Sequence, residues 1–400
     1  MSKQVKLQEQ PFTWPKGYTS DAVHAGLRHK KLDLGWVVST VPAAAAGVYT
    51  TNQICAAPTT STKKLIQQHQ QLQAIIVNSA YANACTGKQG EQDVKEEQQL
   101  VATKLGIAPE LVGVASTGLI GTCLPMEKMR LGIQQLQQTT NPLITEAILT
   151  TDTKTKTMCL TAEIDGKTCT FTGFAKGSGM IHPNMATMLG FVVTDCAIAP
   201  STLQQLLSEL TDQTFNQITV DGDTSTNDMV VLLANGQAET AEITENSADY
   251  EVVKSVYQFL LTTLAKQIAQ DGEGATKLLE VTVKGAKTVQ EARVAAKAIV
   301  GSNLVKSAMF GADPNWGRII SSLGATTIHL NPDTLNLTMN GISLLAKGQV
   351  LDFQPEKVSA TLQQPEIAIE VDLQVGTASG QAWGCDLTYD YVKINATYST

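Results

Sequence analysis

The sequence predicts an α/β protein in which helices cover layered sheets. Strand-length apolar runs alternate along the chain with stretches whose apolar residues recur at helical spacing. Strands and helices that interleave in this way bury their apolar faces against each other. The chain has 400 residues, of which 43% are hydrophobic, so it can bury a large core, typically as two domains or subdomains. It has no internal repeats and no low-complexity segments.

Short apolar runs between turn signals predict the strands. Such runs are typical of strands that are buried in a sheet. The expected strands cover residues 74–77, 112–115, 168–174, 189–194, 229–234, 279–283, 367–373 and 387–394.

Apolar periodicity and capping signals predict three helices. Ser201 with Gln204, just after Pro200, and Thr288 with Glu291 have the spacing of capping boxes. These boxes open expected helices at residues 202–210 and 292–300. A longer periodic pattern at residues 250–269 is typical of an amphipathic helix.

Composition and charge narrow the class of protein. The net charge of −8 argues against a nucleic-acid partner or an acidic membrane surface, which would need clustered lysine and arginine. No run approaches the ~20 apolar residues of a membrane span, and residues 1–15 lack the apolar core of a secretion signal. We therefore expect a cytoplasmic protein without a nucleic-acid or membrane partner.

The cysteines carry no metal or redox motif. They are odd in number and scattered, without the close pairs of a zinc site or a redox centre. We expect free buried thiols and no metal. The seven are Cys55, Cys85, Cys123, Cys159, Cys169, Cys196 and Cys385.

Residues 176–189 (KGSGMIHPNMATML) contain a threonine that could become a nucleophile. Thr187 lies between two expected strands and thus at the edge of a sheet. A threonine hydroxyl needs a base, and cutting the Ala186–Thr187 bond would supply one in the new α-amine, whose ordinary pKa of about 7.7–8.0 suits proton transfer near neutral pH. The alternative from spacing alone is that Ala186 and Thr187 are ordinary residues that enter a strand.

Six further short blocks accompany residues 176–189 along the chain: residues 116–121 (STGLIG), 150–153 (TTDT), 220–228 (VDGDTSTND), 271–277 (DGEGATK), 313–318 (DPNWGR) and 391–396 (YVKINA). Short glycine-rich strings are weak signals one at a time, but seven in order are specific. The seven blocks resemble, in order, those of the glutamate N-acetyltransferase family, also called ornithine acetyltransferase or ArgJ. Residues 176–189 look like that family's cleavage segment.

The resemblance implies a fold and a chain organisation. The fold would be ArgJ-like, similar to N-terminal-nucleophile hydrolases but distinct in topology. Self-cleavage would divide the precursor into an α chain, residues 1–186, and a β chain, residues 187–400. The two chains would stay associated, as a heterotetramer of two α and two β chains.

The resemblance also implies a reaction. Thr187 would take the acetyl group from N2-acetylornithine and pass it to glutamate in a ping-pong cycle of arginine biosynthesis. This needs no metal or other cofactor, and the sequence leaves open whether acetyl-CoA is a second donor. The family's oxyanion hole falls on Thr117 and Gly118. Its substrate-binding positions fall on Thr150, Lys176, Thr187, Glu273, Asn395 and Thr400.

Several of these positions have other interpretations. Thr151 could take the place of Thr150 after a one-residue shift, and residues 116–121 could be a turn that needs glycine. Lys176 and Glu273 could be solvated surface charges. Asn395 could cap the end of a strand. We expect structural roles for His182, which the α-amine makes unnecessary as a base, and for residues 313–318.

The sequence departs from the family in two places. Ala80 and Tyr81 stand where the family has glycine and asparagine, and alanine lacks access to left-handed dihedrals, so the turn there is expected to differ. Residues 154–156 (KTK) lack a proline that often precedes the family's lysine.

Two other functions fit parts of the same pattern. A self-processing N-terminal-threonine amidohydrolase or aminopeptidase would pass the acyl group to water. A non-catalytic metabolite-binding protein would keep its chain intact.

Overall fold

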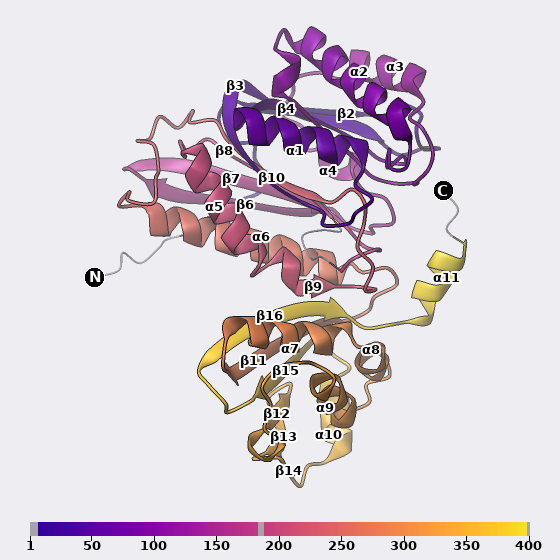
Figure 1. The fold of residues 1–400 in the computed structure, drawn as a ribbon, viewed down its shortest axis with the longest axis vertical. Helices are drawn as coiled ribbons and strands as arrows, with labels where there is room; N and C mark the ends of the chain where they lie inside the picture. The colour runs from indigo at the N-terminus through magenta and orange to yellow at the C-terminus, as the bar shows by residue number, and fades with distance from the viewer. Residues whose placement is uncertain (1–6, 183–187, 398–400) are drawn as a thin grey trace.

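A computed structural model describes residues 7–182 and 188–397, and in these residues the strands form two sheets (Figure 1). The first sheet has nine strands: β1 (Gln8–Glu9), β6 (Lys156–Ile164), β7 (Lys167–Lys176), β8 (Leu189–Thr194), β10 (Met229–Ala234), β3 (Leu34–Tyr49), β4 (Gln71–Asn78) and β5 (Val112–Ser116) in spatial order, with β2 (Tyr18–Val23) beside β3. The second has seven: β14 (Gln349–Val350), β13 (Ile342–Ala346), β12 (Asn336–Met339), β15 (Glu366–Asp372), β11 (Leu278–Ala286), β16 (Ala378–Cys385) and β9 (Ile218–Thr219).

The first sheet folds over itself at β3. The register between β3 and β4 breaks between Val38 and Ala43, and the later part of β3 pairs with β10. The two resulting layers face each other across an apolar core to which β3, β4 and β5 contribute from one side and β7, β8 and β10 from the other. Successive residues of a strand point to opposite faces. Phe191 and Val193 of β8 therefore enter this core, while Val192 packs against helices on the outer face.

Helices cover both outer faces, so the first unit has four layers (Figure 1). α2 (Gly87–Leu105) and α3 (Met126–Gln135) pack outside β3 and β4. On the other outer face, α5 (Pro200–Thr211) packs on the later part of β3, and α6 (Tyr250–Gln270) packs on β6 and β7. The other helices of this unit are α1 (Ala57–His69), α4 (Ile144–Ala147) and the 3₁₀ turns Pro109–Leu111 and Phe215–Gln217. The expected layered α/β fold is confirmed.

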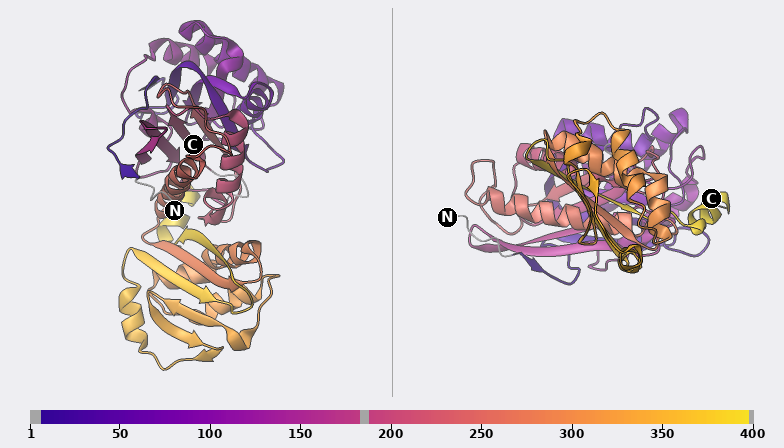
Figure 2. Two further views of the ribbon diagram at one scale, coloured as in Figure 1. Left: turned by 90° about the vertical axis from the view of Figure 1, so that its left-hand side faces the viewer. Right: turned by 90° about the horizontal axis from the view of Figure 1, so that it is seen from below.

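The second sheet forms a smaller unit below the first (Figures 1 and 2). α7 (Val289–Gly301) packs on β11 and β16, and α6 contacts both sheets. The remaining elements are α8 (Asn303–Phe310), α9 (Trp316–Gly324), the 3₁₀ turn Pro332–Thr334 and α10 (Pro355–Thr361). Residues 313–318 have the predicted structural role, since Trp316 packs on this core and Arg318 Nη1 donates to the Leu304 carbonyl at 2.8 Å.

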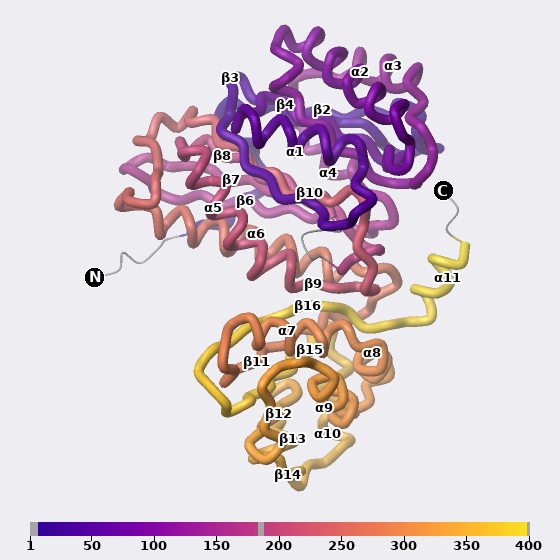
Figure 3. Tube along the Cα trace, viewed as in Figure 1, coloured from indigo at the N-terminus to yellow at the C-terminus, as the bar shows by residue number. Residues whose placement is uncertain are grey.

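Seven of the eight expected strands are confirmed, and the last is wrong. Residues 387–394 lie mostly in a helix, α11 (Tyr389–Thr397), to which the chain turns after β16 (Figure 3). The Thr388 hydroxyl donates to the Gly274 carbonyl at 2.7 Å and accepts from the Asp390 amide at 3.2 Å. These bonds turn the backbone away from the sheet, so the β-forming residues find no strand partner and tertiary contacts override propensity.

The three expected helices are confirmed, but only one capping prediction holds. Thr288 accepts from the Glu291 amide as predicted, although the Glu291 carboxylate bonds His329 at 2.6 Å rather than reaching back. At α5 the N-cap is Ala199, without a side-chain bond. The Gln204 side chain instead bonds the Gly47 amide and carbonyl of β3 at 3.0 and 3.2 Å.

The seven cysteines are free, but they are not all buried. Cys159, Cys169, Cys196 and Cys385 are buried, Cys55 is partly exposed, and Cys85 and Cys123 are exposed. The expectation of buried thiols is therefore wrong for the last three, all of which lie in connecting segments of the first unit.

No helix among residues 7–182 and 188–397 combines the length and the apolar content that a membrane crossing requires.

Candidate active site

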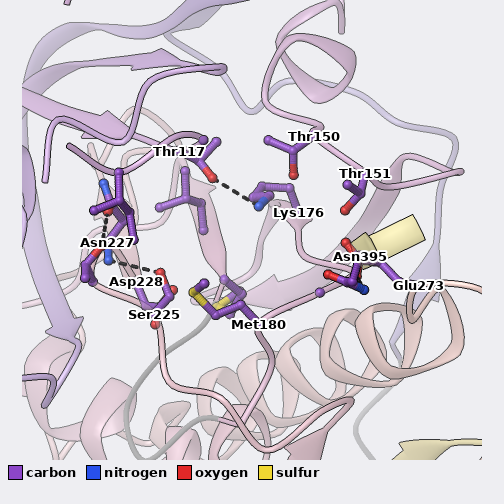
Figure 4. Close-up of a pocket in the computed structure, with 16 residues that line it drawn as sticks. Thr117, Thr150, Thr151, Lys176, Met180, Ser225, Asn227, Asp228, Glu273 and Asn395 are labelled. Carbon is purple, nitrogen blue, oxygen red and sulfur yellow. Dashed lines mark hydrogen bonds between the residues drawn. The ribbon is translucent and has the colours of Figure 1, made fainter. Parts of the chain in front are cut away.

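A pocket opens at one end of the first sheet, where its two layers meet (Figure 4). It lies at the ends of β5 and β7 and the starts of β8 and β10. It is lined by Thr117, Gly118, Ile120, Thr150, Thr151, Lys176, Gly179, Met180, Met188, Leu189, Ser225, Thr226, Asn227, Asp228, Glu273 and Asn395. Segments from six parts of the chain thus meet in one cavity, among them most of the residues that the sequence singled out.

Thr117 and Gly118 form a fixed turn directly after β5. The Thr117 amide donates to the Asn78 carbonyl at 3.0 Å, and the Leu119 amide donates to the Ala80 carbonyl at 2.9 Å. Gly118 has φ 131°, and a Cβ there would lie 2.2 Å from the carbonyl carbon of Ala80. No other residue fits so close to the backbone. The turn therefore does need its glycine, and it also presents Thr117 and Gly118 to the pocket.

Ala80 has a left-handed backbone conformation, which glycine adopts more readily than alanine. Its φ is 84°, although alanine in the left-handed region costs about 1–2 kcal/mol. The Asn78 side chain donates to the Tyr81 carbonyl at 2.9 Å and helps hold this turn. Hydrogen bonds that involve Asn78, Tyr81 and Leu119 fix the turn and outweigh the local strain, and the expected difference from the family's turn stays a prediction.

Lys176 is the last residue of β7, and its side chain points across the pocket to Thr117 (Figure 4). Its Nζ donates to Thr117 Oγ1 at 3.1 Å, and only 8% of the residue is exposed. Burial lowers the pKa of this ammonium, while the carboxylates of Asp152 and Asp228 act against that shift. Lys176 is therefore not a solvated surface charge.

Thr150 and Thr151 both line the pocket, as Figure 4 shows. The Thr150 amide donates to Asp152 Oδ2 at 3.0 Å, and its carbonyl accepts from Arg28 Nη2 at 3.1 Å. The backbone of Thr150 is therefore fixed from both sides. The hydroxyl of either threonine could serve as the expected substrate contact.

Glu273 and Asn395 meet on the side of the pocket away from Asn227 (Figure 4). Asn395 Nδ2 donates to Glu273 Oε2 at 2.7 Å, and Glu273 is buried. Gly179 lies against this carboxylate, since a Cβ there would be 2.3 Å from its carboxyl carbon. Glu273 is thus not a surface charge, and Asn395 lies within helix α11 rather than at a strand end.

The chain is held firmly on both sides of residues 183–187. The Asp221 carboxylate accepts from the Met180 and Ile181 amides at 2.6 and 2.8 Å. On the other side, the Met188 carbonyl accepts from the Met229 amide at 3.1 Å. Ala186, Thr187 and Thr400 lie outside the described residues, but Met188, which follows Thr187 in sequence, lines the pocket.

His182 has a structural environment. Its Nδ1 lies 2.9 Å from Thr219 Oγ1, and its carbonyl accepts from the Thr224 hydroxyl at 3.0 Å. Burial, with a smaller effect from the Lys297 charge, lowers its pKa to about 4. It does not line the pocket that the described residues form.

Sequence reasoning missed the polar residues that support the pocket. Asn227 Nδ2 donates to the carbonyls of Ala82 and Ser116 at 2.5 and 2.9 Å and so ties the start of β10 to the end of β5. Asp152 and Asp271 accept bonds from three neighbouring segments. All three residues stand in the blocks that carry the resemblance, which was the available signal. Among the described residues, no group of three or more histidine, cysteine, aspartate and glutamate side chains could hold a metal ion.

Comparisons with known proteins identify the family. The ArgJ family model matches residues 19–400. An "Arginine biosynthesis bifunctional protein ArgJ" from Lactiplantibacillus plantarum is 56% identical over 395 residues, which cover 99% of this chain and 98% of that protein. The protein of the same name from Geobacillus kaustophilus is 54% identical over 390 residues, covering 96% and 95%.

A solved structure agrees with these relatives. The crystal structure of an ArgJ from Bacillus halodurans is 50% identical, with a TM-score of 0.52, and the match covers 53% of this chain and 100% of that chain. Because the family model spans nearly the whole sequence and curated relatives are more than half identical over it, the chain belongs to the ArgJ family.

Proposed function

We propose that this ArgJ-family acyltransferase moves an acetyl group from N2-acetylornithine to glutamate, after cutting itself between Ala186 and Thr187. The observation that carries the proposal is the convergence of Thr117, Lys176, Glu273 and Asn395 on one pocket. That pocket also includes Met188, the residue after Thr187.

The charges of the pocket suit an amino-acid substrate. Lys176 offers an ammonium group and Glu273 a carboxylate, and both line the cavity (Figure 4). A zwitterionic amino acid carries both a carboxylate and an amine, and charge-assisted hydrogen bonds to each would orient it. Asn395 and one of the two threonines, Thr150 or Thr151, would add polar contacts.

The proposed transfer has two steps. The Thr187 hydroxyl attacks the acetyl carbonyl of N2-acetylornithine, the amide C–N bond breaks, and ornithine leaves with the proton that the Thr187 α-amine has accepted. The amine of glutamate then attacks the acetyl-threonine ester, and N-acetylglutamate leaves as the threonine hydroxyl is restored. Thr117 and Gly118 would stabilise the negative oxygen in each step. The cycle is balanced without a metal or other cofactor.

Two further parts of the proposal rest on relatives. The relatives' name calls them bifunctional, which supports acetyl-CoA as a second acetyl donor for glutamate. The Bacillus halodurans chain is covered in full by the match, which spans 53% of this chain. Residues 187–400 would make up a similar share after the cut, 214 of 400 residues. We propose that the two chains assemble as a heterotetramer of two α and two β chains.

Purified protein tests the proposal directly. Intact mass and N-terminal sequencing should find two chains, the second starting at Thr187, and ornithine release from N2-acetylornithine should depend on glutamate. Ornithine release at the same rate without glutamate would indicate the amidohydrolase instead. An intact chain without release would indicate a metabolite-binding protein. N-Acetylglutamate formed from acetyl-CoA would establish the second activity.

A further inference from the structure

A buried cluster of charges lies behind the pocket. Lys156, at the start of β6, is 1% exposed, and its Nζ donates to Asp152 Oδ1 and to Asp271 Oδ2, both at 2.6 Å. Lys156 is not among the residues that line the pocket. A buried ammonium between two carboxylates is costly unless each charge is paired, and here each is.

The two carboxylates hold the backbone that forms the pocket. Asp152 accepts from the Gly177 amide at 2.7 Å and from the Thr150 amide at 3.0 Å. It thereby fixes the residue after Lys176 and the start of the Thr150–Thr151 pair.

Asp271 fixes the third segment. Its carboxylate accepts from the Thr153 hydroxyl and amide, the latter at 3.0 Å, and its carbonyl accepts from the Ser178 hydroxyl at 2.6 Å. The Ser178 carbonyl in turn accepts from the Glu273 amide at 2.9 Å. Glu273, Lys176 and Thr150 are therefore placed relative to one another by bonds that begin at Asp152 and Asp271.

We propose that Lys156 is a positioning residue for the acetyl transfer, because its ammonium bonds Asp152 and Asp271 and holds them side by side, so that their hydrogen bonds fix Thr150, Lys176 and Glu273. The inference rests on the proposed function. Lys156 acts on the substrate only through other residues.

The electrostatics behind the pocket agree with this role. Burial alone would raise the pKa of Asp152, but the charges of Lys176 and Lys156 outweigh it and hold that pKa at about 2. The charged groups that face the cluster are Asp152, Lys156, Lys176, Asp228, Asp271 and Glu273. Without Lys156, the Asp152 carboxylate would keep only Lys176 as a neighbouring cation, and its pKa should rise.

Lys156→Met is the test, and Lys277→Met is its matched control. Lys277 is also buried but donates to backbone carbonyls of α8, Met309 at 2.6 Å and Phe310 at 3.4 Å, away from the pocket. We expect Lys156→Met to lower kcat/KM for N2-acetylornithine by about 100-fold, as for a displacement of about 1 Å in a site. As the pH is lowered, the activity of Lys156→Met should also begin to fall at a higher pH than the activity of the parent does. Lys277→Met should keep the parent's pH profile.

The melting temperature against pH gives a readout that needs no activity. An unfolded aspartate has a pKa of about 3.9. Because the folded pKa of Asp152 is lower, its ionisation stabilises the fold above that value, and this contribution is lost as pH falls through about 2. In Lys156→Met the folded pKa lies higher, so the loss should begin at higher pH than in the parent.

A double variant keeps the inference open to refutation if Lys156→Met does not fold. Lys156→Met with Asp271→Asn removes one charge of each sign and leaves the Asp152–Lys176 pair, so its pH profile and acid melting curve should return toward the parent's. A double variant that loses stability at the same pH as Lys156→Met would overturn the inference, as would a Lys156→Met enzyme equal to Lys277→Met. A parent that releases no ornithine would instead refute the proposed function.

Discussion

The two units of the chain bury different kinds of residue. Between residues 278 and 385, the second unit's core is apolar, and Lys306 is the one buried charged side chain in that range. The first unit buries charges where the pocket lies, among them Asp152, Lys156, Lys176 and Asp228. Burying a charge costs free energy, and protein interiors rarely keep one without a reason.

This difference separates stability from chemistry. Substitutions in the second unit should change the free energy of unfolding and leave the reaction alone. Substitutions at the pocket of the first unit should change the reaction, with smaller effects on folding. Each prediction below tests one side of that division.

The largest effect is expected at the proposed nucleophile. Thr187→Ala removes the only side-chain oxygen at that position, so both self-cleavage and transfer should be abolished. Denaturing gel electrophoresis and intact mass would then show one chain of 400 residues. Thr187→Ser, which keeps a hydroxyl, should still be cut, but more slowly. Two chains from Thr187→Ala would remove Thr187 from the mechanism.

The second-largest effect is expected from removing one donor of the proposed oxyanion hole. Thr117→Ala should lower kcat by about 10²- to 10³-fold, the usual cost of losing such a group, and should slow self-cleavage as well. It also leaves Lys176 Nζ without its acceptor. Thr117→Ser keeps the hydroxyl and should retain most of the activity. Equal rates for Thr117→Ala and the parent would assign the turn a structural role only.

A core substitution in the second unit tests whether that unit contributes to stability alone. Ile369 on β15 is fully buried, and Ile369→Ala should cost about 2–5 kcal/mol of unfolding free energy through lost contacts and a cavity. The midpoint of chemical denaturation measures this, with Ile369→Val as the milder comparison. Because the residue is far from the pocket, kcat should not change. A lower kcat in the folded variant would break the division between the units.

A smaller effect is expected at α11. Asn395→Ala removes the hydrogen bond to Glu273, and KM for N2-acetylornithine should rise about 10-fold for one bond of roughly 1–1.5 kcal/mol. Self-cleavage should continue, because it needs no bound substrate. Thr397→Ala on the same helix, whose hydroxyl bonds the Lys393 carbonyl, serves as the control. Deleting residues 396–400 should likewise impair transfer but not cleavage.

The smallest effect is expected at the strained turn. Ala80→Gly should raise the unfolding free energy by about 0.5–1 kcal/mol, because release of left-handed strain exceeds the entropy that glycine adds to the unfolded chain. Denaturation midpoints would show it. A destabilised variant would mean that the Ala80 methyl group packs usefully against its surroundings.

Much of the first sheet was predictable because its central strands are buried on both faces, as in β8 and β10, where all six residues of each strand are buried. In the second sheet, β15 was predictable from its alternation of buried and exposed residues. The α11 helix was not predictable, because local residues favour a strand and the turn at Thr388 depends on Gly274, more than a hundred positions away.

The site, too, was predictable from the sequence only in part. The pocket residues Thr117, Gly118, Thr150, Lys176, Glu273 and Asn395 were found through the resemblance. Lys156 was not, because a lysine is usually exposed and its partner Asp271 is 115 positions away. Pairing at that distance depends on the folded sheet rather than on any local pattern.

The place of β8 in the first sheet has a consequence for refolding. Its strand neighbours are β7, which precedes the proposed cut, and β10, which follows it. The uncut precursor folds as one molecule, but after cleavage an unfolded enzyme would consist of two separate chains that must find each other before this sheet can form again. The mature protein would then stay folded because it unfolds slowly. Its refolding from denaturant would depend on protein concentration, because two chains must associate.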